Sequence, residues 1–533
     1  MLFSPPDKQR TMAEQIKKPQ TKTLEKDNTN KTVLGITLVL AGLYYFYSTK
    51  SKGFYQQDEA AHFLNMLDFW YTPNEMLGNW AKPGYKVLFA LPALLGKNFV
   101  AFVNCLVAAF SAYFAYLTAK NLKAGAPWMA FVLLATQPFW ISLSFRNYSE
   151  FITAFLLIVG VYFYTKNKHI FAALLLSYCC TIRQEFYPIL AIYGLVLLIG
   201  KNWVPMLLLA LFPLLQNLWG YLASGDPIYL YNQILGGSAE LKDIYPRQGF
   251  DHYLKTLHVV FGPVALTLAL VYLSWCVLAK KQPNWVLVVP VFLFILINCL
   301  FNWQAYPIGP STGGNLRYMC VIAPLVAVMA ALGASELHKL PQSYKVLYAL
   351  VPFAFITYVW LGYKHNFIML TDEPDPTSFI GVALASALVF LPVKNNVQAW
   401  SLSGLSLFFI LLTVKALPLG EEDKACKQLA EWYKVNEKQF SDRPKFINHT
   451  MFYYWLDKNS KSFNPVPKQL SPDSLATAKP GTLVFWDSHY SFRPARKTGV
   501  DLQYFAQNQG KYNLLHEIRS PSNNFAAFVF EVK

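Results

Sequence analysis

The chain has 533 residues, of which 54% are hydrophobic and 14% are charged, and its formal net charge is +16. A soluble globular protein carries about 25% charged residues, so this composition excludes a soluble chain. Apolar runs of about 20 residues recur along most of the sequence, which indicates a protein that crosses the membrane many times. Lys and Arg lie mostly in short loops, where they set topology and meet membrane lipids, so no nucleic acid is expected as a partner.

Residues 1–31 are polar and rich in Lys, which predicts a disordered cytoplasmic tail. The apolar run from Thr32 to Tyr47 is followed by no small-residue cleavage site, so we expect it to remain as a membrane anchor. The next stretch, 49–96, then forms an outer loop. Within this loop the run from Gly84 to Leu95 has only about 12 residues, which favours an interfacial helix over a membrane span.

The later loops that are rich in Lys all lie on the cytoplasmic side only if Gly84 to Leu95 does not cross the membrane. If this run crossed, every later assignment would invert and the Lys pairs would lie outside. The first scheme predicts about thirteen spans within residues 32–416. After Thr32 to Tyr47, the predicted spans are Phe99 to Ala119, Trp128 to Leu143, Phe151 to Tyr164, Ile170 to Thr181, Tyr187 to Ile199, Trp203 to Leu222, Leu257 to Leu278, Trp285 to Phe301, Met319 to Leu332, Val346 to Leu361, Ile380 to Leu391 and Leu402 to Thr413.

The composition changes sharply from Leu417 to Lys533, which the span count places on the outer face. Glu421 to Lys438 has helical spacing, with Leu429 and Tyr433 on one apolar face together with Trp432. Four short strand-like runs follow, namely K-F-I-N, T-L-V-F-W, Y-N-L-L-H-E-I and F-A-A-F-V-F-E-V. The sequence therefore predicts a mainly α, polytopic helical bundle with a small α/β domain of roughly 110 residues at its C-terminus.

Ionisable residues close to membrane spans are costly and therefore mark candidate functional sites. The first outer loop contains the adjacent acids Asp58 and Glu59, and Asp58, His62 and Asn65 form a polar stripe on a predicted helix. Its apolar surface would hold this helix in the membrane interface. An ionised Asp58 at that boundary could act as general base on an acceptor hydroxyl. Stabilisation of the helix start without any catalysis explains the same spacing.

Two further clusters of acids and bases lie in later outer loops. The first contains Arg146 and Glu150, and the second contains Arg183 and Glu185. The planar guanidinium of Arg suits a phosphate, which a polyprenyl-phosphate donor would present at this depth. Ion pairing that closes the helical bundle is the alternative for both clusters.

Arg317 and Tyr318 open a late span after a Gly- and Pro-rich loop, in which a Gly pair permits close approach of the backbone to a ligand. An interfacial Arg beside a Tyr of the aromatic belt is the alternative explanation. The longest outer loop carries Tyr245 and Arg247, which could line a sugar or acceptor site. Mixed polar loops of this kind are more often simply solvated.

The sequence gives no sign of a cofactor. Its seven Cys form no C-x-x-C pair, and no nucleotide-phosphate, H-E-x-x-H or G-x-S-x-G motif occurs in a usable context. A nucleotide sugar is also a poor donor at an outer face, because it is cytosolic. A lipid-linked sugar fits better, and its phosphate is a fair leaving group, so we expect no cofactor. A divalent metal is the alternative, which no motif indicates.

Five stretches resemble the multi-span glycosyltransferases of the C type, with protein mannosyltransferases and aminoarabinose transferases as the most similar groups. The stretches are D-E-A-A-H-F-L-N-M-L, K-P-G-Y-K-V-L-F-A-L-P-A-L-L-G, R-N-Y-S-E-F, T-I-R-Q-E-F and N-L-R-Y-M-C-V-I-A-P. The resemblance extends to about residue 330. One departure is that Lys82-Pro83 is followed by Gly84, where the family more often has Pro or Val with Leu.

This resemblance implies an inverting transferase that moves a monosaccharide from a polyprenyl phosphate to a hydroxyl of a glycan, lipid or protein. It implies a bacterial inner-membrane location and Asp58 as the base, with Glu59 as its catalytic partner. It further assigns the donor phosphate to Arg317, Arg183 and Tyr318. Other expected substrate contacts are Lys82, Glu150, Arg146, Glu185, His62, Tyr245 and Arg247. A flippase for a lipid-linked sugar, or a polymerase or ligase of lipid-linked glycans, remains the alternative.

Overall fold

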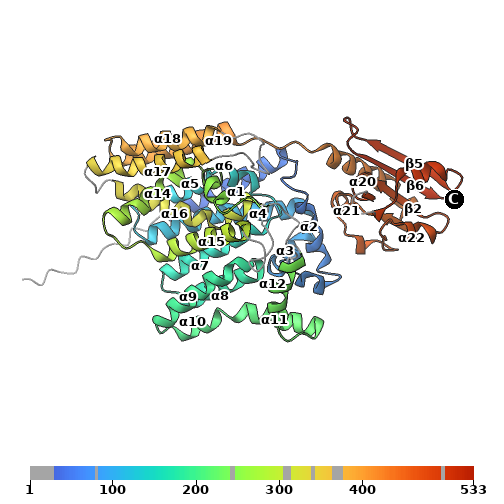
Figure 1. Ribbon diagram of the computed structural model, residues 1–533, viewed down its shortest axis with the longest axis horizontal. Helices are drawn as coiled ribbons and strands as arrows, with labels where there is room; N and C mark the ends of the chain where they lie inside the picture. Colours follow the sequence, from blue (N-terminus) through green and yellow to red (C-terminus); the bar gives the residue numbers. More distant parts are fainter. Residues whose placement is uncertain are drawn as a thin grey trace, which may run out of the picture.

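The computed structural model describes residues 29–78, 82–240, 247–303, 314–337, 342–362, 376–493 and 498–533. Figure 1 shows a large helical part and, at one end, a smaller unit that carries the sheet. This confirms the predicted class, a mainly helical chain with a small C-terminal sheet. The predicted tail lies almost entirely outside the described residues, and the first helix begins at Thr29.

The helices of the larger part follow one another with short connections. Their bounds are α1 Thr29–Lys50, α2 Asp58–Asp68, η1 Pro73–Leu77, α3 Pro83–Ala93, α4 Lys97–Asn121, α5 Trp128–Ala135, α6 Pro138–Leu143, α7 Ser149–Thr165, α8 His169–Ile182, η2 Gln184–Phe186, α9 Tyr187–Ile199, α10 Trp203–Leu208, α11 Leu211–Ser224, α12 Tyr229–Glu240, α13 His252–Phe261, α14 Pro263–Leu278, α15 Trp285–Trp303, η3 Leu316–Ile322, α16 Ala323–Glu336, α17 Gln342–Gly362, α18 Pro376–Phe390 and α19 Asn395–Thr413.

Within the described ranges, six helices are long and apolar enough to cross a membrane, and the bent pair α13–α14 makes a seventh. Five shorter apolar helices accompany them. The expected number of thirteen spans is therefore not confirmed. One physical reason is visible at Trp128 to Leu143, where Pro138 begins a new helix and splits the expected span into α5 and α6.

Protein covers most of the apolar face of α2, which the sequence analysis placed in the membrane interface. Phe63 is fully buried, and its ring centre lies 5.7 Å from that of Tyr454 in the C-terminal unit. Trp70 donates a hydrogen bond from Nε1 to the carbonyl oxygen of Ala90 in α3, at 2.9 Å. Protein thus covers this face from two sides, because α3 and the C-terminal α21 (Thr450–Leu456) pack against it.

Gly84 explains how α3 fits beneath the outer loop. The short helix that was expected over Gly84 to Leu95 is observed as α3, and Pro83 opens it at the first position, where Pro is well tolerated. A Cβ atom at Gly84 would overlap the side chain of Thr181 in α8. Tyr178 of α8 also donates a hydrogen bond to the carbonyl oxygen of Gly84, at 2.9 Å. The departure from the family pattern therefore permits close contact between α3 and α8.

Replacing Gly84 with Ala is expected to destabilise the protein by about 1–3 kcal/mol, because the added methyl group overpacks this contact. Thermal unfolding of the purified chain in detergent measures the effect. Gly78→Ala is the matched control, because a Cβ atom there would have no heavy atom of the described residues within 4 Å. Equal melting temperatures for the two variants would contradict the packing argument.

The C-terminal unit is a four-stranded sheet with helices on it, in the order β1-β2-β6-β5. Strand β1 is parallel to β2, with Lys445 opposite Leu483, and β6 is antiparallel to both neighbours. All four strand-like runs of the sequence form strands. The bounds are α20 Glu421–Phe440, β1 Lys445–Ile447, α21 Thr450–Leu456, η5 Ser460–Ser462, α22 Pro472–Ala476, β2 Leu483–Asp487, β3 Phe492–Arg493, β4 Thr498–Gly499, α23 Leu502–Gln507, β5 Tyr512–Arg519 and β6 Ala526–Val532.

Helix α20 covers the sheet with the apolar face that its sequence predicted. Leu429 and Tyr433 are buried, and the Tyr433 ring centre lies 6.1 Å from that of Phe485 in β2. Trp432, at the edge of this face, stacks on His516 of β5 with ring centres 4.8 Å apart. The core between α20 and the sheet therefore continues into the helical part, whereas a second, separate core in the unit contains Val484, Trp486 and Phe528.

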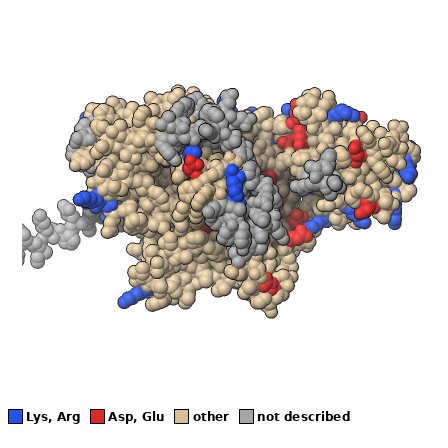
Figure 2. Space-filling model, in the orientation of Figure 1, with Lys and Arg blue, Asp and Glu red and all other residues tan. Residues whose placement is uncertain are grey.

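Polar contacts fasten the C-terminal unit to the first outer loop. The amide of Gly53 donates to the carbonyl oxygen of Leu417 at 2.8 Å, and Lys97 pairs with Asp457 at 2.7 Å. Lys461 reaches Glu75 of η1 at 2.5 Å. Figure 2 shows charged side chains gathered on the C-terminal unit and at this junction, whereas the visible face of the helical part carries few. On this face of the molecule the charged side chains therefore lie mainly on the C-terminal unit and where it meets the helical part.

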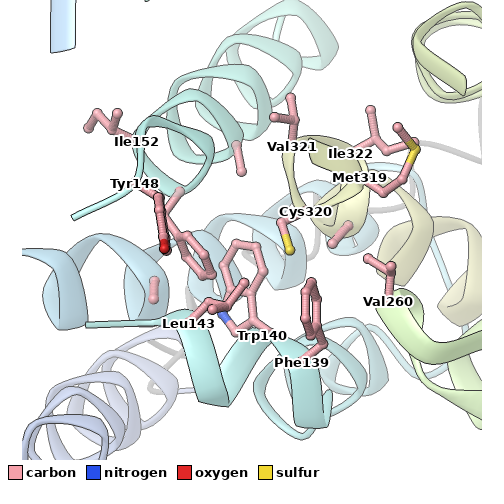
Figure 3. Packing of buried hydrophobic residues seen from close by; sticks show 14 of the residues in the cluster. Phe139, Trp140, Leu143, Tyr148, Ile152, Val260, Met319, Cys320, Val321 and Ile322 are labelled. Atoms are coloured by element: carbon pink, nitrogen blue, oxygen red, sulfur yellow. The ribbon is translucent and has the colours of Figure 1, made fainter. Parts of the chain in front are cut away.

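A layer of aromatic and aliphatic side chains packs beneath the segments that carry Arg146 and Arg317. Figure 3 shows Phe139, Trp140 and Leu143 of α6 facing the segment Met319–Ile322 of η3, with Tyr148 beside them. These side chains are buried, so the loop after α6 and the start of η3 rest on a closely packed layer.

Candidate active site

Arg317 connects several of the predicted site residues. Its Nη2 lies 3.4 Å from Oδ2 of Asp58, and its Nε lies 3.3 Å from Oε1 of Glu150. Its guanidinium also stacks on the ring of Tyr148, 4.2 Å from the ring centre, and bonds Oε1 of Gln56. The start of η3 is thereby joined to α2 and to the first turn of α7.

A second Arg extends this cluster. Arg183 follows α8 directly and pairs with Glu150 at 2.8 Å and with Glu185 at 2.7 Å. Its guanidinium lies 4.6 Å from the ring centre of Tyr318. The buried Nε of Arg183 finds no hydrogen-bond acceptor among the described residues. One donor of this guanidinium is therefore available for an anionic ligand.

Lys82 completes the group of cations. It stands at the start of α3 with a left-handed backbone, and its Nζ donates to Oγ of Ser149 at 3.1 Å. Ser149 Oγ in turn donates to Oε2 of Glu150 at 3.4 Å. One network of hydrogen bonds and ion pairs thus joins six of the predicted residues, namely Asp58, Lys82, Glu150, Arg183, Glu185 and Arg317, and we call it the outer-end cluster.

The carboxylates of this cluster differ in their access to a substrate. Glu150 is 1% exposed and accepts ion pairs from both Arg183 and Arg317. The side chain of Asp58 is 42% exposed, and the ion pair that it makes among the described residues is the 3.4 Å contact with Nη2 of Arg317. A neutral acceptor hydroxyl can therefore approach Asp58, whereas Glu150 serves to hold the two guanidinium groups in place.

Glu59 points away from Asp58 and forms a separate buried pair. Its Oε1 lies 2.8 Å from Nη1 of Arg146 and accepts hydrogen bonds from the amide of Tyr55 at 2.8 Å and the hydroxyl of Tyr148 at 3.1 Å. Arg146 also donates to the carbonyl oxygen of Gly53, at 2.8 Å. We therefore interpret this pair as a support of α2, in place of the catalytic and substrate-binding roles expected from the sequence.

His62 is also placed differently from its predicted polar stripe. It is buried, and its Nδ1 lies 2.7 Å from Nζ of Lys86, which donates to its carbonyl oxygen at 3.0 Å. Burial, followed by the charge of Lys86, lowers the pKa of His62, so its neutral ring can accept from this Lys. Burial likewise lowers the pKa of Lys86. Lys86 was not among the predicted site residues, although it follows Lys82 by four positions in the K-P-G-Y-K run.

The last two predicted substrate contacts are Tyr245 and Arg247. Tyr245 lies outside the described residues. Arg247 donates from Nη1 to the carbonyl oxygen of Phe301, at 3.0 Å. The structure also adds Gln56, which was not predicted, to the cluster. Its Oε1 accepts hydrogen bonds from Nδ2 of Asn315 at 3.2 Å and from Arg317. A glutamine beside two acids has no pattern that sequence reasoning could have singled out.

Lys82 gives the cluster an expected pH dependence. Burial, with a smaller contribution from the charge of Arg183, lowers the pKa of Lys82 to about 8. The charged ammonium group that attracts an anionic donor is thus present below this pH and is lost above it. We expect kcat/KM for the donor to fall about tenfold per pH unit above this value, since one proton is released.

The pH–rate profile of the purified chain checks this expectation. In Lys82→Gln the rate should be low throughout and the fall near pH 8 should disappear. Lys97→Gln, which changes a Lys paired with Asp457 outside the cluster, should keep the fall. A fall that persists unchanged in Lys82→Gln would assign it to another group.

The fold is shared with known membrane enzymes. No protein-family model matches the chain, and no curated protein matches it either. Two solved structures of ArnT from Cupriavidus metallidurans do match in fold. The structure bound to undecaprenyl phosphate has a TM-score of 0.55 at 11% identity, and the apo structure has a TM-score of 0.55 at 12% identity. Each comparison covers 94% of this chain and 98% of the ArnT chain.

The chain therefore has the GT-C fold of the aminoarabinose transferases. This finding confirms the resemblance that the first outer loop and the later Arg-containing motifs indicated. At this level of identity the comparison shows the fold alone, so the chemistry is argued from the outer-end cluster.

Proposed function

We propose that this chain is an inverting glycosyltransferase that moves a monosaccharide from a polyprenyl phosphate to an acceptor hydroxyl. The observation that carries the proposal is the outer-end cluster, in which Lys82, Arg183 and Arg317 converge beside the exposed Asp58. A dianionic or monoanionic lipid phosphate suits three cations at one place. The fold shared with an ArnT structure that is bound to undecaprenyl phosphate supports the same donor class.

In the proposed reaction Asp58 takes the proton of the acceptor hydroxyl as its oxygen attacks the anomeric carbon. The bond between this carbon and the phosphate oxygen breaks, and the lipid phosphate leaves with the electron pair. Positive charge develops at the anomeric carbon in the transition state. Arg183, with its free Nε, and Lys82 neutralise the leaving phosphate, while Glu150 holds Arg183 and Arg317 in position. We propose no metal or other cofactor for this step.

The topology of the sequence analysis goes with this proposal. The N-terminus would lie in the cytoplasm of a bacterium, the chain would span the inner membrane, and residues 417–533 would form a periplasmic domain. The outer-end cluster would then face the periplasm, where a lipid-linked sugar is present and a nucleotide sugar is not.

A flippase for a lipid-linked sugar is the second candidate. Broken helices are typical of transporters, and α13 and α14 bend by 117° at Gly262. Transporters also carry charged groups near the centre of the membrane, however, whereas this cluster lies at the ends of its helices beside the first outer loop. The geometry therefore favours transfer over transport.

The assay that separates these candidates follows the fate of the donor. The full chain, purified in detergent, is incubated with polyprenyl-phosphate pentoses and hexoses and with an extract of bacterial envelope lipids and glycans. A transferase releases free polyprenyl phosphate and labels an acceptor. An intact donor that only changes leaflet in vesicles containing the chain would overturn the proposal in favour of the flippase.

A further inference from the structure

Three side chains with metal-ligating atoms converge where the C-terminal unit meets α2. They are Glu422 in the first turn of α20, His449 just before α21 and His489 in the turn after β2. One ligand atom of each lies within 4.8 Å of the other two. Oε1 of Glu422 is 2.9 Å from Nε2 of His449 and 2.8 Å from Nδ1 of His489. The outer-end cluster contains none of these residues.

The backbone around these side chains is held in place. Asp487, the last residue of β2, accepts hydrogen bonds from the amides of His489 at 3.0 Å and Tyr490 at 2.6 Å, which fixes the turn. His449 is buried and lies between the rings of Tyr490 and Phe525, with ring centres at 4.8 Å and 5.6 Å. His489 is 45% exposed, so the group is open to solvent on one side. The backbone on both sides of this ligand set is therefore held in place before an ion binds.

We propose that Glu422, His449 and His489 bind one divalent transition-metal ion of the zinc class. Two imidazole nitrogens and one carboxylate oxygen form a ligand set that zinc uses in proteins, whereas Ca²⁺ and Mg²⁺ prefer oxygen ligands alone. Three protein ligands leave a fourth position for water or another group. Gln57 lies next to this position, because its Nε2 donates to Oε1 of Glu422 at 3.0 Å.

The competing explanation is that hydrogen bonds alone bring these three side chains together. It differs from metal binding in which ring nitrogen of His449 carries the proton. In the structure Nδ1 of His449 accepts from the amide of Met451 at 3.2 Å, so the proton of the neutral ring lies on Nε2 and points to Glu422. A metal at Nε2 requires this proton on Nδ1 instead, where it faces the Met451 amide. Metal binding therefore shifts the tautomer of His449 and loosens the first turn of α21.

Such an ion would tie the C-terminal unit to the helix that carries Asp58. Gln57 precedes Asp58 directly and contacts Glu422, and the hydroxyl of Tyr490 donates to Oε1 of Gln57 at 3.3 Å. The ion is thus a positioning and stabilising element, and no step of the proposed sugar transfer passes through it. This set could not be predicted from the sequence, because its members are far apart in the chain and match no metal motif.

Zinc titration of the full chain tests the proposal. The protein is purified in detergent, stripped with a chelator, dialysed and titrated with Zn²⁺ by calorimetry, and Co²⁺ absorption reports the coordination. We expect about one ion per chain with micromolar or tighter affinity. Glu422→Gln and His489→Ala should each weaken binding at least about tenfold, a loss typical of a removed metal contact.

His516→Ala is the matched control, since it removes a histidine of the same sheet that stacks on Trp432 outside the group. It should bind zinc like the wild type. The proposal is overturned if the wild type binds no zinc at these concentrations. It is also overturned if Glu422→Gln and His489→Ala each bind zinc as tightly as the wild type. His489 is 45% exposed, and Gln keeps the size and shape of Glu422, so Glu422→Gln and His489→Ala are both expected to melt like the metal-free wild type, which thermal unfolding verifies. Binding and melting require no turnover, so the outcome is independent of the proposed transferase activity.

Discussion

Asp58→Asn is expected to lower kcat for sugar transfer by about 10²- to 10⁴-fold, the usual contribution of a general base. Asn keeps the shape of the side chain but cannot take the proton of the acceptor hydroxyl. Because Asp58 is 42% exposed and makes only a 3.4 Å contact with Arg317, the folded state should lose little stability. Steady-state rates with a saturating polyprenyl-phosphate sugar, together with thermal unfolding, measure both quantities.

Asp68→Asn is the matched control for this variant. Asp68 ends the same helix, α2, and lies outside the outer-end cluster, 4.0 Å from Lys461. Its replacement should leave kcat nearly unchanged. Wild-type turnover by a folded Asp58→Asn variant would remove Asp58 from the mechanism and leave the Arg residues as the only support for the site.

Arg146→Met should have the largest effect on stability. The Arg146–Glu59 pair is nearly inaccessible to solvent, with 1% and 7% of the two side chains exposed. Removing one partner of a buried ion pair leaves an uncompensated charge and typically costs about 3–5 kcal/mol. We expect a strongly lowered melting temperature in detergent, and activity lost through displacement of α2.

The double variant Glu59→Leu/Arg146→Met separates the charge from the packing. It removes both ions, so it should recover a large part of the stability that Arg146→Met loses. A double variant that is less stable than either single variant would show that the hydrogen bonds to Tyr55 and Tyr148 matter more than the ion pair.

Local sequence patterns correctly predicted the secondary structure that is determined by residues close to one another in the chain. The four strand-like runs of the C-terminal part form β1, β2, β5 and β6, because alternation and turn residues act locally. The family resemblance similarly led to Asp58, Arg183 and Arg317, which the structure brings into one network. Each of these residues lies at or beside the end of a helix, and helix packing brings these ends together.

Contacts between distant segments were beyond this reasoning. Glu59 and Asp58 are adjacent, yet successive residues of a helix point about 100° apart, and only the position of Arg146 decides which acid is buried. His62 likewise seemed part of an exposed stripe until Lys86 of α3 covered it. The apolar face of α2 was expected in the membrane interface and packs against the C-terminal α21, because hydrophobicity alone does not distinguish these two surroundings.

The attachment of the C-terminal unit to the first outer loop has a consequence for evolution and for protein engineering. The buried side chains of α20 and α21 belong to one continuous core with those of α2 and the helical part. A lineage could not gain or lose this unit as an independent module without exposing Phe63 and its neighbours on α2. Chimaeras with related enzymes should therefore exchange the unit and the segment 49–96 together, since the two share one packed interface.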